Sequence, residues 1–344
     1  MNYLDQICEW SSQDRQTIQD TIAIDSTRIR IPTSDCSFIS NWITSDIIEV
    51  LEDTGEPIRR RRQKSISDRF EGITTRYQVK NLRVGNSCNT FLTIGISSKL
   101  AKEDYFNGIS CNNLEPIYKE IQSQGFASFS FDSFRRANTN DTDYKIDFIP
   151  NQNPVKMVKA FYDNAPLVKD SRRGVSHYLR QDNCGIQYGL RETTLTKYPF
   201  LKFYEKLREL FFSSDEFYRT HLKPIQQGSH LMRAETTIKS KKHYKILGAD
   251  DTSLFNVVNQ SKEIASNAFQ RAFDGHLPNS IEFPVETDFE LGVTDKVHLL
   301  LLRKSMKLGL SLENSIEDIL SQCCLDKQQR YRLRNRLTKL CAFL

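Results

Sequence analysis

The sequence predicts an α+β fold: a central, mainly antiparallel β-sheet with flanking helices, followed by a mostly helical C-terminal region. Short β-like runs alternate with helical runs as far as about residue 250, and beyond that point the apolar spacing is helical. The 344 residues are 38% hydrophobic, which is enough to build a core without disulfides or a structural metal.

The elements are expected in the following order. Residues 1–21 form an N-terminal helix or tail, and the charge-rich segment 55–68 is an exposed loop. Strands are expected at 22–32, 74–84, 90–97, 126–134, 143–150, 184–191, 199–207 and 230–240. Helices are expected at 98–104, 113–124, 154–163, 253–273, 297–310, 314–324 and 326–340. These elements divide the chain into an N-terminal helix or tail (1–21), a mixed α+β domain (22–250) and a mostly helical C-terminal region (251–344).

Composition narrows the class of protein. The eight cysteines lack C-x-x-C spacing and nearby histidine pairs, so neither a zinc knuckle nor a disulfide framework is expected. A reducing cytoplasm is the simpler interpretation. No apolar run approaches the roughly 20 residues that span a bilayer, and no signal peptide is recognisable. We therefore expect a soluble protein without a membrane partner.

Basic residues gather in two places although the formal net charge is only +5. Clustered arginine and lysine are typical of a polyphosphate partner, because each phosphate contact releases counterions. The alternative is a solvated loop and a solvated helix face. The first cluster is Arg59, Arg60, Arg61, Arg62 and Lys64, and the second is Lys327, Arg330, Arg332, Arg334, Arg336 and Lys339. From these clusters Arg59 to Arg62, Arg332, Arg334 and Arg336 are candidate DNA-binding residues.

Three expected strands separate cleanly into an apolar face and a polar face, as a half-buried strand should. Their polar faces together predict one sheet surface that carries carboxylates, cations and a tyrosine. These residues are Asp143, Lys145 and Asp147 in DYKIDF, Lys202, Tyr204 and Lys206 in FLKFYEK, and Arg233, Glu235, Thr237 and Lys239 in MRAETTIK.

Such a surface is a candidate active site. Asp147 and Glu235, together with Asp143, supply the hard oxygen ligands that Mg²⁺ or Mn²⁺ prefers. Tyr204 is the candidate nucleophile and Lys206 the cation that favours its phenolate or holds a phosphate. Lys202 and Arg233 are further candidates for contact with DNA. The alternative is structural: a packing tyrosine, and carboxylates in cross-strand charge pairs with residues such as Lys206 or Arg233.

At these segments the sequence resembles the initiators of rolling-circle replication, above all the replication endonucleases of filamentous phages and more distantly the plasmid Rep_trans initiators. LKFYEKLREL (201–210) is similar to the nucleophile strand of that family, in which lysine follows the tyrosine at +2 and Glu-Leu at +5 and +6. Here these positions hold Tyr204, Lys206 and Glu209-Leu210.

Further motifs follow the order of the same family over residues 22–248. DYKIDF resembles its metal strand, with Lys145 in place of the usual arginine and Asp147 retained. The family's glutamate falls on Glu235, and IDSTRIRIP and FLTIGISSKLAKEDYFNG resemble the elements upstream. There are also departures: none of the six histidines forms a His-x-His pair, so the resemblance implies a carboxylate-based metal site, and no Walker A sequence is present.

The resemblance implies a metal-dependent nickase that forms a 5′-phosphotyrosine and leaves a 3′-hydroxyl primer. Its partners would be the single- and double-stranded DNA of an origin, with a host helicase and polymerase. It would act in bacterial cytoplasm, and the phage-like motif order favours a phage over a plasmid. Two alternatives stay open: a non-catalytic origin-binding or copy-control protein, and a relaxase or transposase of the same chemical class.

Overall fold

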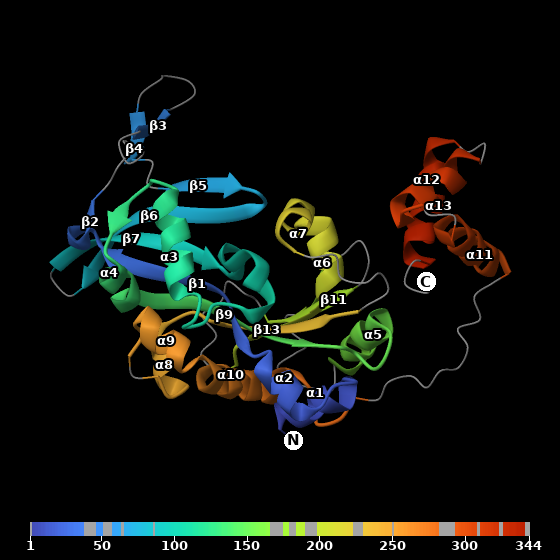
Figure 1. The fold of residues 1–344 in the computed structure, drawn as a ribbon, viewed down its shortest axis with the longest axis horizontal. Coiled ribbons are helices and arrows are strands. Elements are labelled where there is room, and N and C mark those ends of the chain that lie inside the picture. The colour runs from blue at the N-terminus through green and yellow to red at the C-terminus, as the bar shows by residue number, and fades with distance from the viewer. Residues whose placement is uncertain are drawn as a thin grey trace.

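A computed structural model describes most of the chain. The described residues are 2–37, 46–50, 57–62, 65–84, 87–165, 175–178, 184–189, 198–222, 230–249, 251–281, 293–307, 310–322 and 326–340. They form an α+β fold with a large antiparallel sheet, flanking helices and a helical C-terminal region, which confirms the predicted fold class (Figure 1).

Nine strands of the described part form one sheet, in the order β10-β11-β12-β13-β9-β1-β7-β6-β5. Every neighbouring pair in it is antiparallel. The strands are β1 (Ala23–Pro32), β5 (Ser65–Phe70), β6 (Ile73–Val84), β7 (Ser87–Ser97), β9 (Asn138–Phe148), β10 (Ser176–Tyr178), β11 (Gly185–Tyr188), β12 (Phe200–Glu205) and β13 (Met232–Ile238). Two small ribbons lie outside it, β2 (Cys36–Ser37) with β8 (Ser128–Phe129) and β3 (Asp46–Val50) with β4 (Pro57–Arg62).

Two predicted elements were wrong. The segment expected as a loop over 55–68 contains strands β4 and the start of β5, because its arginines and serines are paired with other strands along their backbones. The segment 126–134 forms only the two-residue strand β8 before helix α4 (Phe131–Arg136) begins. Ser130 caps that helix by accepting from the Ser133 N–H, and such a cap favours helix over strand.

Helices cover the apolar face of the sheet at β12 and β13. The ring of Phe203 on β12 packs against Trp10 of α1 (Tyr3–Trp10), Phe161 of α5 (Pro154–Asn164) and Phe273 of α10 (Ser261–His276). Ile146 and Ala234 on the neighbouring strands are also fully buried. Burial at this face removes a large apolar area from water and is the main stabilising term of the fold. Figure 1 shows α1 and α10 together below the sheet and α5 beside its right-hand end.

The polar face is covered by η3 (Ser98–Asn107), α6 (Lys206–Ser213) and α7 (Asp215–His221). Gly108 ends η3 with φ +68, and a Cβ at this position would lie 2.6 Å from that of Ala23 on β1. Only glycine combines this backbone conformation with so close an approach. It also lets the Ile109 N–H donate to the Ile24 carbonyl at 2.8 Å. The end of η3 is thereby fixed against β1, beside the candidate site.

The remaining helices do not all belong to these layers. Along the described part of the chain they are α2 (Arg15–Asp20), η1 (Thr33–Asp35), α3 (Leu114–Ser123), α8 (Lys241–Ile246), α9 (Leu254–Asn259), α11 (Val293–Lys307), α12 (Leu312–Ser321) and α13 (Lys327–Leu340). Residues of α9 and α10 belong to the hydrophobic core of the sheet, whereas α11, α12 and α13 share a separate apolar cluster. The division of the chain at residue 250 stays a prediction. In the described residues, no helix has both the length and the apolar character needed to cross a membrane.

Candidate active site

The strand register brings the predicted polar residues onto one face. Lys202 on β12 lies opposite Glu235 on β13, and Glu235 lies opposite Lys145 on β9. One pleat away, Tyr204 lies opposite Arg233, which lies opposite Asp147. Directly opposed side chains on antiparallel strands are close enough to interact. The alternation read from the sequence therefore places these six residues on one surface.

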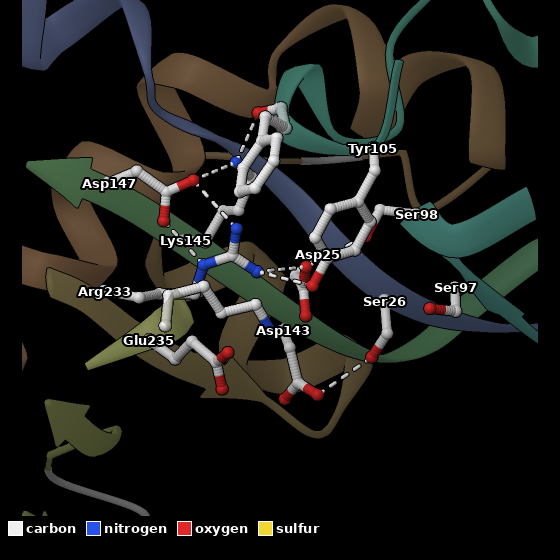
Figure 2. A network of polar contacts seen from close by, with 12 residues as sticks. Asp25, Ser26, Ser97, Ser98, Tyr105, Asp143, Lys145, Asp147, Arg233 and Glu235 are labelled. Atoms are coloured by element: carbon white, nitrogen blue, oxygen red, sulfur yellow. Dashed lines mark hydrogen bonds and ion pairs between the residues drawn. The ribbon is translucent and has the colours of Figure 1, made fainter. Parts of the chain in front are cut away.

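Arg233 is the centre of this surface. Its guanidinium donates to both carboxylate oxygens of Asp147, from Nε at 2.5 Å and from Nη2 at 2.8 Å, and from Nη1 to Asp25 at 2.7 Å. Figure 2 shows Arg233 between Asp147 and Asp25, which approach it from β9 and β1. The arginine is 0% exposed. The planar fork of arginine suits the bidentate binding of Asp147. Together the ion pairs with Asp147 and Asp25 fix three strands relative to one another.

A β-bulge in β1 brings Asp25 into this network. The register of β1 against β9 shifts between Ile24 and Ser26, which leaves Asp25 as the extra residue. Asp25 accepts from Arg233 and from Ser98 of η3, while the adjacent Ser26 donates to Asp143. Two consecutive side chains thus reach the same polar surface, which a regular strand does not allow.

Lys145 is as deeply buried as Arg233. Its ammonium donates to Asp147 at 2.5 Å and to the Phe106 carbonyl at the end of η3 at 2.5 Å. Burial lowers the pKa of Lys145 and opposes the effect of Asp147, which favours the charged form. For Asp147 burial works against ionisation, but Arg233 and Lys145 outweigh it and hold its pKa below the usual value.

Tyr204 donates its phenol proton to the carboxylate of Glu235. The other oxygen of Glu235 is bound by the Lys202 ammonium at 2.5 Å. This ammonium lies over two rings, 4.3 Å from the centroid of Tyr204 and 4.4 Å from that of Tyr178. Burial, followed by the charge of Glu235, raises the pKa of Tyr204 well above its usual value. In this arrangement Tyr204 is a neutral phenol held against a carboxylate.

Lys206 connects Tyr204 to the arginine network. Its ammonium lies 3.3 Å from the Tyr204 hydroxyl and donates to Glu209 at 2.7 Å. It also lies over the ring of Tyr105, whose hydroxyl accepts from Arg233 at 3.3 Å. Burial raises the pKa of Tyr105 to about 12. Although burial alone would lower it, the pKa of Lys206 is raised by Tyr105 and by the carboxylates around it, so Lys206 stays a cation beside the phenol.

The three predicted metal ligands do not converge on one point. Asp147 is bound by Arg233 and Lys145, and Glu235 by Tyr204 and Lys202. Asp143 accepts from the hydroxyls of Ser26 and Thr237. In the part of the chain that the structure describes, no group of three or more His, Cys, Asp or Glu residues is arranged to hold a metal. As arranged here the donor set does not fit a divalent cation, and the expectation of Mg²⁺ or Mn²⁺ stays a prediction.

The structure separates the candidate DNA-binding residues into three groups. Lys202 and Arg233 are buried within the ion pairs described above. Arg332, Arg334 and Arg336 lie exposed on α13. Arg59 to Arg62 belong to β4, but their side chains are outside the described residues, as is Lys64 altogether. A role in DNA binding stays a prediction for all of them.

Sequence reasoning missed Asp25 and Tyr105. Asp25 had a detectable signal, because the buried isoleucines of β1 fall at Ile24, Ile29 and Ile31, and the odd spacing of the first two breaks strict alternation and indicates a bulge. Tyr105 had none, since its place in the network depends on how the end of η3 packs over the sheet.

Comparisons with protein-family models, with curated proteins and with solved structures each found no match for this chain. The resemblance to rolling-circle initiators therefore stays a prediction that rests on the motifs and their order.

Replacing Arg233 by methionine should lower the free energy of unfolding by about 3–5 kcal/mol, because it leaves buried carboxylates uncompensated. The measurement is urea unfolding at neutral pH. Arg15→Met is the matched control, since the ion pair of Arg15 with Asp5 is half-exposed and should contribute less than about 1 kcal/mol. Equal losses in the two variants would contradict the central role of Arg233.

The network also predicts how stability depends on pH. Although burial opposes it, Arg233 helps to hold the pKa values of Asp25 and Asp147 below that of an unfolded aspartate, about 3.9. The stability that these groups supply is complete above the unfolded pKa and is lost as pH falls through the folded values. Urea unfolding between pH 7 and pH 3 should therefore show a steeper decline below about pH 4 for wild type than for Arg233→Met. Parallel curves would refute this linkage.

Proposed function

We propose that this chain is a rolling-circle replication initiator that nicks one strand of origin DNA with Tyr204 and keeps the 5′ end as a phosphotyrosine. The observation that supports it best is the surroundings of one phenol: Tyr204 is hydrogen-bonded to Glu235 and lies 3.3 Å from the Lys206 ammonium. A carboxylate to take the proton and a cation to favour the phenolate are what an activated tyrosine requires. The motif order described from the sequence supports the same reaction.

In the proposed reaction the Tyr204 oxygen attacks phosphorus while its proton passes to Glu235. A bond between Oη and phosphorus forms and the bond between phosphorus and O3′ breaks. The departing O3′ takes a proton from solvent water and becomes the primer hydroxyl. Lys206 stays charged beside the phenol and is placed to offset negative charge on the reacting phosphate.

Access to Tyr204 sets a condition on this reaction. Its side chain is 2% exposed, and the ring of Tyr178 on β10 lies edge-on to it with centroids 5.0 Å apart. A DNA strand has to displace this cover before phosphorus reaches the phenol oxygen. The bound state is therefore expected to differ from the structure described here at β10.

The burial of Tyr204 also favours a second, non-catalytic function. If the tyrosine and carboxylates serve only to hold the strands together, the chain is a non-catalytic origin-binding or copy-control protein. The pairing of Asp147 with Arg233 and of Glu235 with Lys202 supports this alternative, because both carboxylates are already neutralised within the protein. A relaxase or transposase would share the chemistry but act on a different DNA site.

The test is incubation of the protein with labelled single-stranded fragments of its replicon and Mn²⁺ or Mg²⁺, followed by a denaturing protein gel. Wild type should form a covalent adduct, and Tyr204→Phe should form none. Tyr244→Phe is the matched control, because it removes another buried hydroxyl, one that donates to Thr142 on the apolar face. DNA binding by wild type without an adduct would favour the non-catalytic function, and an adduct in Tyr204→Phe would reject this tyrosine.

A further inference from the structure

Helix α13 has a face that the nicking reaction does not use. Its fourteen residues, KQQRYRLRNRLTKL, include six lysines and arginines and no acidic residue. Leu337 and Leu340 are buried and Leu333 packs beside them, against the apolar cluster that also holds Leu302 of α11 and Ile316 of α12. The apolar stripe of α13 is therefore already covered by the other two helices, which leaves its opposite face to solvent.

Helices α11, α12 and α13 pack together as a bundle, in which ion pairs also fix the two sides of α13. Arg330 and Arg334 pair with Glu317 of α12, and Arg336 pairs with Asp295 of α11 at 2.5 Å. These contacts set the rotation of α13 about its own axis. They also mean that three of its six cations are directed toward the bundle, and that a stripe with a different composition faces outward.

The outward stripe consists of Gln328, Tyr331, Arg332, Asn335 and Lys339, all of them exposed. Their spacing of three, four, seven and eleven residues from Gln328 places them on one face of a helix. Tyr331 is 66% exposed, which is unusual for a large aromatic side chain. The stripe is about 16 Å long at 1.5 Å per residue, which is the length of roughly five base pairs.

We propose that this stripe, the α13 outer face, reads base edges in the major groove of duplex DNA. The side-chain types fit that partner: arginine pairs with guanine and asparagine or glutamine with adenine in the major groove. Lys339 and Lys327, at opposite ends of the helix, are placed for phosphate contacts, which position the helix without specifying sequence. The proposal assigns base-reading residues and does not depend on the nicking reaction.

Other partners fit the α13 outer face less well. A helix that binds a membrane surface needs leucine, phenylalanine or tryptophan opposite its basic side, and the leucines of α13 are buried in the bundle. Double-stranded RNA has a deep, narrow major groove that side chains cannot read. Duplex DNA accepts a helix in a groove about 12 Å wide and offers hydrogen-bonding groups that match this stripe.

The experiment uses the full chain carrying Tyr204→Phe, so that bound DNA is not cut. A pool of random-sequence duplexes is incubated with the protein, and the bound fraction is sequenced. The parent protein, with α13 unchanged, should preferentially bind duplexes that share a short sequence motif. Arg332→Lys keeps the positive charge but loses the bidentate fork of arginine. It should therefore reduce the preference for one base, at one position of the motif, by roughly tenfold. Its affinity for non-specific duplex should stay within about twofold of the parent.

One control and a second test variant make the result specific to the α13 outer face. Lys304→Ala removes an exposed cation of α11 and should leave the motif unchanged. Asn335→Ala should weaken the base preference at a second position of the motif, next to the position that Arg332 specifies. The proposal is overturned if no motif is enriched, if Arg332→Lys and Asn335→Ala enrich the same motif as the parent, or if double-stranded RNA or anionic vesicles are bound more tightly than duplex DNA. If a motif is enriched but the wild-type protein, with Tyr204 intact, forms no covalent adduct on DNA that carries it, only the nicking function is refuted.

Discussion

The ion pairs of Arg233 organise the centre of this protein. A fully buried guanidinium on β13 binds Asp147 on β9 and Asp25 on β1, so that one side chain connects three strands. Taking such charges out of water costs several kcal/mol for each ion unless the hydrogen bonds are complete. Completing them requires the register between the strands, the bulge at Asp25 and the position of Ser98. The geometry of the polar face follows from this requirement.

The two faces of the sheet are stabilised by different forces. Below it, Phe203 and its aromatic neighbours bury apolar area, and such packing tolerates changes of similar volume. Above it, Arg233, Lys145 and Lys206 are ordered by directional hydrogen bonds, which tolerate little change. This difference explains how a site with a defined geometry for Tyr204 is built on a sheet whose other face is an ordinary hydrophobic core.

Much of this arrangement could be predicted from the sequence. Alternation along β9, β12 and β13 placed Asp147, Tyr204 and Glu235 on one face, and the antiparallel register confirmed that placement. Alternation does not say which carboxylate meets which cation, since that depends on register and rotamer. Hence Asp147 and Glu235, which were expected to hold a metal, are found with lysine and arginine instead. Strand β4 was missed because its arginine run resembles a loop in composition, and composition does not show that it pairs with β3 just upstream.

The nucleophile is the claim on which the proposed function depends most. The direct measurement is mass spectrometry of the wild-type protein after reaction with its origin strand, nuclease digestion of the DNA and proteolysis. The account predicts a nucleotide remnant on the peptide that contains Phe200 to Glu205, attached at Tyr204. A remnant on Tyr105 or Tyr178, which lie in the same network or against the same ring, would contradict that assignment.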